Sequence, residues 1–231
     1  MTFEICTDSF EGALAATKYD VKRIELCSAL SVGGLTPSYG LIKQCEALDK
    51  LSLQVMIRPK PGGFQYNASD IKIMMADIKA SKKLGAQGVV FGILDAHNNI
   101  SPSNQTLIDL AKSLDLETTF HRAFDFVTDY HKAINQLITF GFDRVLTSGL
   151  QPTAEAGFSI ISELQAFYGT KIQIMAGSGV NAKNALKFAE SGINQLHFTA
   201  HKQGEIPLPL GMGFETIVDE AKIESIVRQF S

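Results

Sequence analysis

The chain has 231 residues, of which 45% are apolar, and a formal net charge of -3. This length and composition suit one large α/β domain or two small ones with a substantial core. The slightly acidic balance argues against a nucleic-acid partner, and no apolar run reaches the roughly 18 residues that a membrane span needs.

The first residues lack the basic and long apolar regions of a signal peptide and are expected to form a strand. The three cysteines, Cys6, Cys27 and Cys45, are an odd number without framework spacing, which suits a reducing cytosol. We therefore expect a cytoplasmic protein.

Eight β-type runs follow one another along the chain, and each precedes a helix-type run. The expected strands are Thr2–Cys6, Lys22–Cys27, Leu53–Arg58, Gly88–Leu94, Glu117–Phe120, Arg144–Thr147, Lys171–Ala176 and Gln195–Thr199. The expected helices are Phe10–Tyr19, Tyr39–Leu48, Ile71–Leu84, Gln105–Leu114, Asp129–Phe140, Ala154–Tyr168, Ala182–Ser191 and Thr216–Gln229. A similar helix-to-strand corner recurs at Gly85, Gly141 and Gly192, which indicates an internal βα repeat.

Eight βα units in this length predict a closed (β/α)8 TIM barrel formed by a single domain, residues 1–231. A doubly wound open sheet is the alternative, but Cys6-Thr7-Asp8-Ser9 is unlike the glycine-rich turn that such a sheet carries after its first strand. The segment Lys202–Phe214, rich in Pro and Gly, is a candidate lid over the barrel mouth.

Strand alternation predicts an unusually polar barrel lumen, because the apolar sets should face the helices. A buried carboxylate needs a cationic partner, so Glu4 and Glu25 require an arginine or histidine beside them. For Arg23 we favour such an internal network. For Arg58, which precedes a glycine-containing loop, a network and an anion-binding role both remain open. The expected lumen residues are Glu4, Cys6, Arg23, Glu25, Cys27, Arg58, His121 and His197.

The stretch Phe120-His121-Arg122-Ala123-Phe124-Asp125 gathers titratable side chains at the end of an expected strand. The carboxyl ends of barrel strands carry the active site, so His121 or Glu25 is a candidate acid or base, positioned by Asp125, with Arg58 beside them. The alternative is a buried His-Arg-Asp network that only holds the strand end.

Two cysteines, Cys6 and Cys27, end neighbouring expected strands in the same pattern, Glu4-Ile5-Cys6 and Glu25-Leu26-Cys27. Two close thiolates are a soft site suited to Cu(I). Free cysteine is also a common buried apolar residue, which is the competing interpretation, and a disulfide is less expected in the cytosol.

A Gly-Ser-Gly turn, Gly177-Ser178-Gly179, closes the seventh expected strand. Barrels often bind phosphate with the loops after strands seven and eight, so this turn is a candidate anion site, to which Ser148 could add a hydroxyl. Many plain turns contain the same residues.

Six motifs, taken together and in order, resemble the CutC family of copper homeostasis proteins. They are Arg23-Ile24-Glu25-Leu26-Cys27, Gly33-Gly34-Leu35-Thr36-Pro37-Ser38, Met56-Ile57-Arg58-Pro59, Phe120-His121-Arg122-Ala123-Phe124-Asp125, Leu146-Thr147-Ser148-Gly149 and Met175-Ala176-Gly177-Ser178-Gly179. The resemblance implies a (β/α)8 barrel, a cytoplasmic location, a homo-oligomer and a Cu(I) site at Cys6 and Cys27.

Two functions are therefore expected to compete. One is Cu(I) binding in copper homeostasis, and the other is catalysis on a small phosphorylated or carboxylated metabolite at the barrel mouth. In the second, Arg58 and Gly177–Gly179 would hold the anion. We expect a copper ion or a small anionic metabolite as partner, without nucleic acid or membrane.

Overall fold

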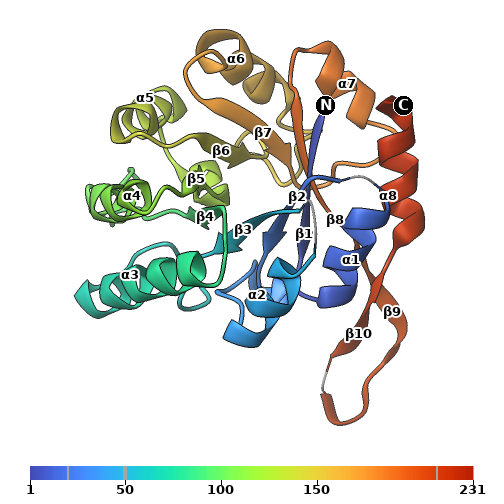
Figure 1. Ribbon diagram of the computed structural model, residues 1–231. Coiled ribbons are helices and arrows are strands. Elements are labelled where there is room, and N and C mark those ends of the chain that lie inside the picture. Colours follow the sequence, from blue (N-terminus) through green and yellow to red (C-terminus); the bar gives the residue numbers. More distant parts are fainter. Residues whose placement is uncertain (20, 49–50, 212, 231) are drawn as a thin grey trace.

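The computed structural model describes residues 1–19, 21–48, 51–211 and 213–230. Eight parallel strands close into a barrel in chain order, and helices cover the outside (Figure 1). The strands are β1 (Thr2–Thr7), β2 (Arg23–Leu26), β3 (Ser52–Met56), β4 (Gly88–Phe91), β5 (Glu117–Phe120), β6 (Arg144–Thr147), β7 (Gln173–Gly177) and β8 (Gln195–Thr199). The predicted (β/α)8 barrel is confirmed.

The helices begin where side chains cap their free N–H groups. Ser9, Ser38 and Asp129 each accept a backbone N–H in the first turn that follows, and Asn67 and Asp70 form a reciprocal capping box. The α-helices are α1 (Phe10–Lys18), α2 (Tyr39–Glu46), α3 (Ala68–Lys83), α4 (Ser103–Ser113), α5 (Tyr130–Phe140), α6 (Phe158–Tyr168), α7 (Ala185–Glu190) and α8 (Glu220–Val227). No helix in the described ranges has the length and apolar character to cross a bilayer.

The apolar core lies between the strands and the ring of helices. Ile5, Ile24 and Val55 are fully buried there, as the alternation of side chains along each strand predicts. The opposite faces of the same strands point into the barrel and are polar, so the titratable side chains are concentrated in the lumen.

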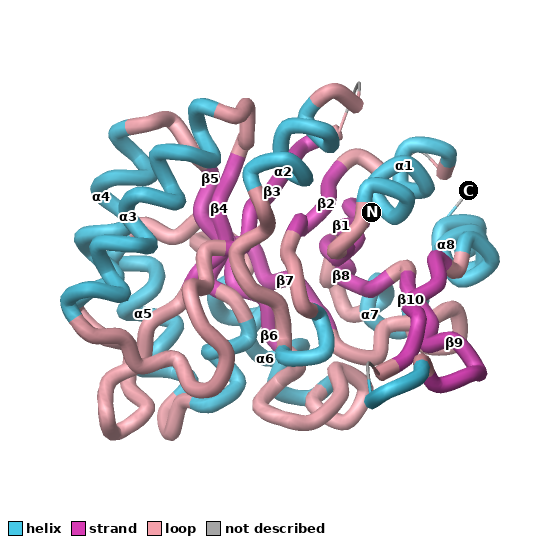
Figure 2. The backbone as a smooth tube through the Cα atoms, turned by 90° about the horizontal axis from the view of Figure 1, so that it is seen from below, coloured by secondary structure: helices cyan, strands magenta, loops and turns pink. Residues whose placement is uncertain are grey.

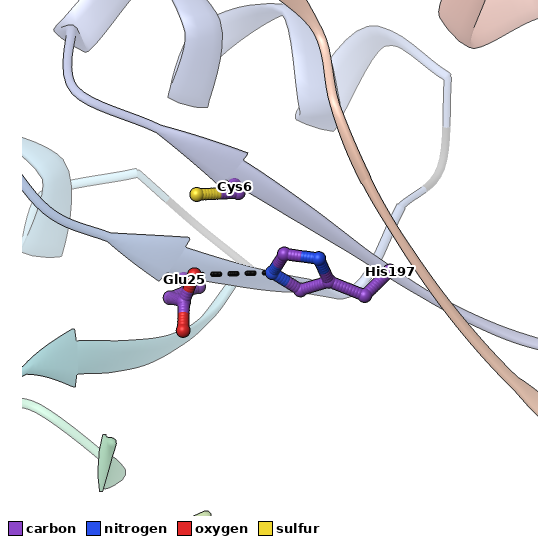
Figure 3. Close-up of side chains that lie close together, drawn as sticks. All are labelled: Cys6, Glu25 and His197. Carbon is purple, nitrogen blue, oxygen red and sulfur yellow. Dashed lines mark hydrogen bonds and ion pairs between the residues drawn. The ribbon is translucent and has the colours of Figure 1, made fainter. Parts of the chain in front are cut away.

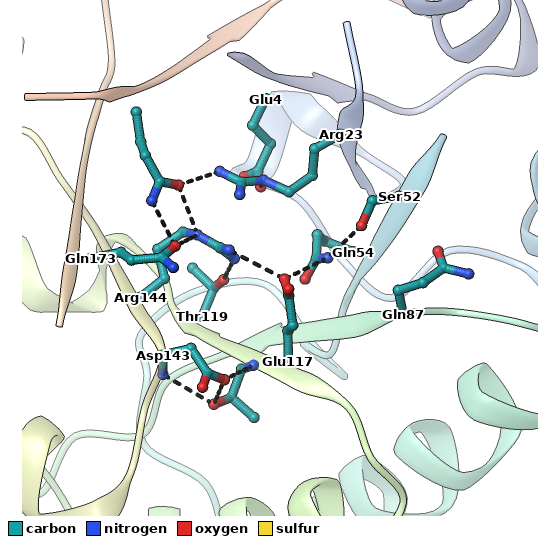
Figure 4. A network of polar contacts seen from close by, with 12 residues as sticks. Glu4, Arg23, Ser52, Gln54, Gln87, Glu117, Thr119, Asp143, Arg144 and Gln173 are labelled. Carbon is teal, nitrogen blue, oxygen red and sulfur yellow. Dashed lines mark hydrogen bonds and ion pairs between the residues drawn. The ribbon is translucent and has the colours of Figure 1, made fainter. Parts of the chain in front are cut away.

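The part of the lumen near the N-terminal ends of the strands holds a hydrogen-bonded polar layer (Figure 4). Arg23 Nε lies 2.5 Å from Glu4 Oε2, and its Nη2 donates to Gln195 Oε1 at 2.6 Å. Arg144, fully buried, donates to Thr119 at 2.9 Å and to Glu117 at 3.2 Å. The network expected for Arg23 is therefore present, whereas the lumen position of Arg144 was not predicted.

The end of the chain differs from its prediction. The expected helix Thr216–Gln229 starts only at Glu220, because Phe214–Val218 forms strand β10, rich in β-branched residues, against β9 (His201–Pro207). The expected helix Ala154–Tyr168 likewise begins later, at Phe158.

The candidate lid Lys202–Phe214 lies largely in this β9–β10 hairpin; its residue 212 is outside the described residues. The hairpin extends sideways from the barrel, past α1 in Figure 1 and beside α8 in Figure 2. Since none of its described residues lines the mouth cavity, the prediction of a lid is not supported.

Candidate active site at the barrel mouth

A cavity of about 610 Å³ opens at the carboxyl ends of the strands. Its polar side chains come from six different strands or the loops that follow them, so the barrel closure itself brings them together. Apolar side chains, among them Phe64 and Phe126, form part of its wall. The polar and titratable residues that line it are Cys6, Glu25, Arg58, Gln65, Asn98, His121, Arg122 and His197.

Glu25 and His197 form an ion pair at the base of this cavity (Figure 3). His197 Nε2 lies 3.0 Å from Glu25 Oε2 and 3.8 Å from Glu4 Oε1. Burial opposes a charge on the ring, but the two carboxylates outweigh it and raise the pKa of His197. Burial likewise disfavours the Glu25 carboxylate, yet His197 lowers its pKa below the usual value. The second oxygen of Glu25, Oε1, is buried and has no hydrogen-bond partner among the described residues.

His121 is held in a neutral form. It caps the 3-10 helix η2 (Arg122–Phe126), where its Nδ1 accepts the N–H of Ala123 at 3.2 Å, so the ring proton resides on Nε2. Burial first, and then the charge of Arg58, lowers the pKa of His121 to about 4 against the attraction of Glu25. Nε2 is buried without a partner in the described chain. His121 is therefore a neutral hydrogen-bond donor facing the cavity.

A glycine makes this position of His121 possible. A Cβ at Gly92, just after β4, would lie 2.8 Å from the His121 ring, closer than real Cβ contacts come. The ring instead packs against Phe64, with centroids 4.9 Å apart.

Arg58 lines the cavity, but most of its N–H groups donate hydrogen bonds to backbone carbonyls of the protein itself. Its Nη1 donates to the carbonyls of Val32 and Gly34, both at 2.8 Å, and its Nη2 to that of Gly62 at 2.7 Å. Its guanidinium also stacks 5.2 Å from the Phe64 ring centre. Of the two interpretations left open for Arg58, the geometry favours the network, with only Nε left buried and unpartnered in the described chain.

Asp125 does not position His121, contrary to our expectation. Its oxygens accept from the Thr147 hydroxyl at 2.5 Å, the Ser148 N–H at 2.9 Å and Arg122 Nε at 2.8 Å. This carboxylate ties η2 to the loop after β6. Ser148 belongs to the same cluster, is fully buried and does not line the cavity, so it does not add a free hydroxyl to an anion site there.

The thiols of Cys6, in β1, and Cys27, directly after the neighbouring strand β2, lie 3.9 Å apart, as the sequence pattern predicts. The contact with Cys27 first, then burial and the charge of Glu25, raises the pKa of Cys6 well above its usual value. Ligand atoms of Cys6, Glu25 and His197 also lie within 4.8 Å of one another. Cys6 lines the cavity, whereas Cys27 is fully buried behind it. The site thus combines a two-sulfur set in the wall of the cavity with a mixed sulfur, oxygen and nitrogen set that faces the cavity, and either could hold a metal ion.

The Gly177-Ser178-Gly179 turn lies apart from these groups. It does not line the cavity, and the Ser178 hydroxyl donates to the carbonyl of Pro152 at 2.9 Å. A Cβ at Gly177 would meet Leu146 at 2.5 Å, so its glycine is explained by close packing. An anion site joining this turn to Arg58 is not formed.

Two titratable residues of the cavity were not among the site residues expected from sequence. His197 was placed in the lumen but given no role, although its alternation on β8 was a usable signal. Arg122 was noticed in its motif, but its direction depends on Asp125 and Ser148 across 26 residues of chain, which no local pattern reveals.

The fold and this cavity define a (β/α)8 barrel protein with acid–base and thiol groups gathered at its C-terminal mouth. Within that class, the chain belongs to the CutC family, whose family model matches residues 1–202.

Curated relatives support the same assignment. A family protein CutC of Glaesserella parasuis is 44% identical over 88% of this chain and 84% of its own. The Bacteroides fragilis counterpart is 43% identical over 87% and 80%.

Solved structures agree on the fold. A CutC crystal structure from Streptococcus agalactiae, provisionally described as a copper homeostasis protein, shares 34% identity with a TM-score of 0.81. It covers 86% of this chain and 98% of its own. A 3-hexulose-6-phosphate synthase, at 11% identity and a TM-score of 0.66 over both whole chains, is similar in fold alone.

Proposed function

We propose that this chain is an enzyme that moves a proton on a small phosphorylated or carboxylated metabolite bound in the mouth cavity. One observation carries the proposal: Glu25 Oε1 and His121 Nε2 are both buried, lack partners among the described residues and belong to side chains that line the same cavity. Buried polar atoms nearly always have a hydrogen-bond partner, and those that lack one within the protein are typical of sites that bind a substrate.

The two groups have complementary roles. Glu25 is ionised because His197 lowers its pKa, so its free oxygen can accept a proton. His121 is neutral with its proton on Nε2, so it can donate a hydrogen bond to an oxygen on which negative charge develops. A base beside a neutral donor suits abstraction of a proton next to a carbonyl group, which passes through an enolate.

The test is exchange of substrate protons with solvent. Carbonyl-containing phosphorylated and carboxylated metabolites are incubated with the protein in D2O, and deuterium incorporation is followed by proton NMR. Glu25→Gln should slow incorporation by about 100-fold or more, because the base is lost while the shape is kept. Cys45→Ser, a change on α2 outside the cavity, is the control and should exchange normally. The proposal is wrong if no metabolite exchanges, or if Glu25→Gln exchanges as fast as the wild type.

A second function, Cu(I) binding in copper homeostasis, is favoured by the 3.9 Å separation of the Cys6 and Cys27 sulfurs. Two thiolates suffice for Cu(I), and the buried pair would release its protons on binding. The contact of Cys27 with the Thr7 carbonyl, at 3.5 Å, holds that thiol beside Cys6.

Anaerobic competition with a chromophoric Cu(I) chelator measures this site. About one Cu(I) per chain is expected, lost in both Cys6→Ser and Cys27→Ser but retained in Cys45→Ser. Undiminished Cu(I) affinity in Cys6→Ser would exclude it. If Cys27→Ser binds normally while His197→Gln does not, the ion is held by the mixed Cys6, Glu25 and His197 set instead.

A further inference from the structure

Arg122 stands at the rim of the cavity in a fixed orientation. Its side chain is 39% exposed, whereas that of Asp125, which holds it, is 4% exposed. Its Nε donates to Asp125 Oδ2 and its Nη2 to Ser148 Oγ, both at 2.8 Å. Asp125 is itself fixed by the hydroxyl of Thr147, the last residue of β6, and by backbone N–H groups of the loop that follows. An exposed arginine normally samples many rotamers, so this anchoring preorganises the guanidinium before a ligand arrives.

The anchoring leaves one edge of the guanidinium open. A guanidinium has five N–H groups, and Asp125 and Ser148 take those on the Nε side. Nη1 has no hydrogen-bond partner in the described part of the chain. One N–H of Nη1 and the remaining N–H of Nη2 form a parallel fork, which matches two oxygens of a carboxylate or phosphate. Arg58 differs, because both hydrogens of its Nη1 are used by the carbonyls of Val32 and Gly34.

The side chains that line the cavity favour an anion as well. They include two guanidinium groups, those of Arg58 and Arg122, and one carboxylate, that of Glu25. A guanidinium that is not fully neutralised attracts a carboxylate or a phosphate, and Arg122 is the one with an open edge.

From this geometry we infer that the open edge of Arg122 binds the oxyanion group, phosphate or carboxylate, of the mouth-cavity ligand. The inference rests on the proposed function, and it names the subsite that selects a phosphorylated or carboxylated substrate. Phe64 and Phe126, whose ring centres lie 5.4 Å apart, both line the cavity and form an apolar wall for the carbon skeleton. The ligand is thus a short molecule with an anionic end at Arg122 and a reactive carbonyl near His121 and Glu25.

The test titrates inorganic phosphate and, separately, acetate into the protein by calorimetry at constant ionic strength. Saturable 1:1 binding of at least one anion is expected, and Arg122→Gln should weaken it at least about 10-fold. Arg122→Lys keeps the charge but loses the fork, and should also weaken it, by a smaller factor. Arg228→Gln, which removes an exposed arginine paired with Glu224 on α8, is the matched control and should bind as the wild type does.

The inference is overturned if neither anion binds the wild type, or if Arg122→Gln binds with unchanged affinity. Preferential loss of phosphate or of acetate binding in Arg122→Gln tells which oxyanion the subsite takes. Its failure is separable from failure of the proposed function. If anion binding depends on Arg122 but no deuterium exchange depends on Glu25, the anion subsite is supported and the proposed enzyme function is wrong. If deuterium exchange depends on Glu25 but is unchanged in Arg122→Gln, the enzyme function is supported and the anion subsite is wrong.

Discussion

At the scale of single residues, the polar atoms of the mouth differ from those of the layer beneath in what they face. Glu25, Arg58 and His121 each keep one buried polar atom that finds no partner within the described ranges, and all three side chains line the mouth cavity. In the layer beneath, Arg23 and Arg144 hydrogen bond to several partners each, and the unpartnered oxygens of Glu4 and Gln54 do not border that cavity. Unmet hydrogen-bonding capacity costs stability, and only at the mouth does it face a space in which a ligand is expected to meet it.

The buried neutral His121 should make the protein sensitive to acid. Its folded pKa is about 4, below the ordinary value of 6.5, so on acidification the unfolded chain takes up this proton first. The free energy of unfolding should therefore fall between about pH 6.5 and pH 4, by up to about 3 kcal/mol from this residue. Urea unfolding at a series of pH values measures the slope.

His121→Gln is the matched variant, since it keeps a polar side chain without the titration. It should flatten the dependence between pH 6.5 and pH 4 relative to the wild type. The raised pKa of His197 acts in the opposite sense, because it stabilises at low pH and loses that effect as pH rises. An equal acid slope in wild type and His121→Gln would contradict the assignment.

At the scale of elements, Arg58 fastens two loops that shape the mouth. Its guanidinium joins the loop after β2, through Val32 and Gly34, to the loop after β3, through Gly62. Removing it leaves three carbonyls without their charged donor. Arg58→Ala should therefore lower the free energy of unfolding by about 2–4 kcal/mol.

Hydrogen exchange read by mass spectrometry locates the effect. Peptides covering residues 30–35 and 60–65 should exchange faster in Arg58→Ala, while α6, on the other side of the barrel, stays as in the wild type. Arg228→Gln, a surface arginine variant, should leave both regions unchanged. Uniform acceleration over the whole chain would instead mean a general loss of stability.

At the scale of the whole molecule, local patterns predicted most of the barrel. Alternation along the strands placed Glu4, Arg23 and Glu25 in the lumen, and the parallel Cys6 and Cys27 motifs brought the thiols together. The prediction that a helix begins at Thr216 was wrong, because Phe214–Val218 pairs with β9. The strand pairing outweighs the local helical periodicity of this segment.

The site was predicted less well, for a physical reason. Which groups are free depends on contacts between loops far apart in sequence. Asp125 is occupied by Thr147 and Ser148, and Arg58 by the carbonyls of Val32, Gly34 and Gly62, and none of these partners can be read from the motif itself. The cytoplasmic location and the homo-oligomeric state stay predictions.

The polar layer beneath the cavity has a consequence for how this barrel can change over time. Arg144 shares Gln195 with Arg23 and Glu117 with Gln54, so replacing any one of them strands several neighbours at once. Substitutions in this polar layer are therefore expected to be tolerated only when several residues change together. Apolar side chains that line the cavity above, such as Phe126 and Leu146, take no part in that network, so ligand preference can change there one side chain at a time.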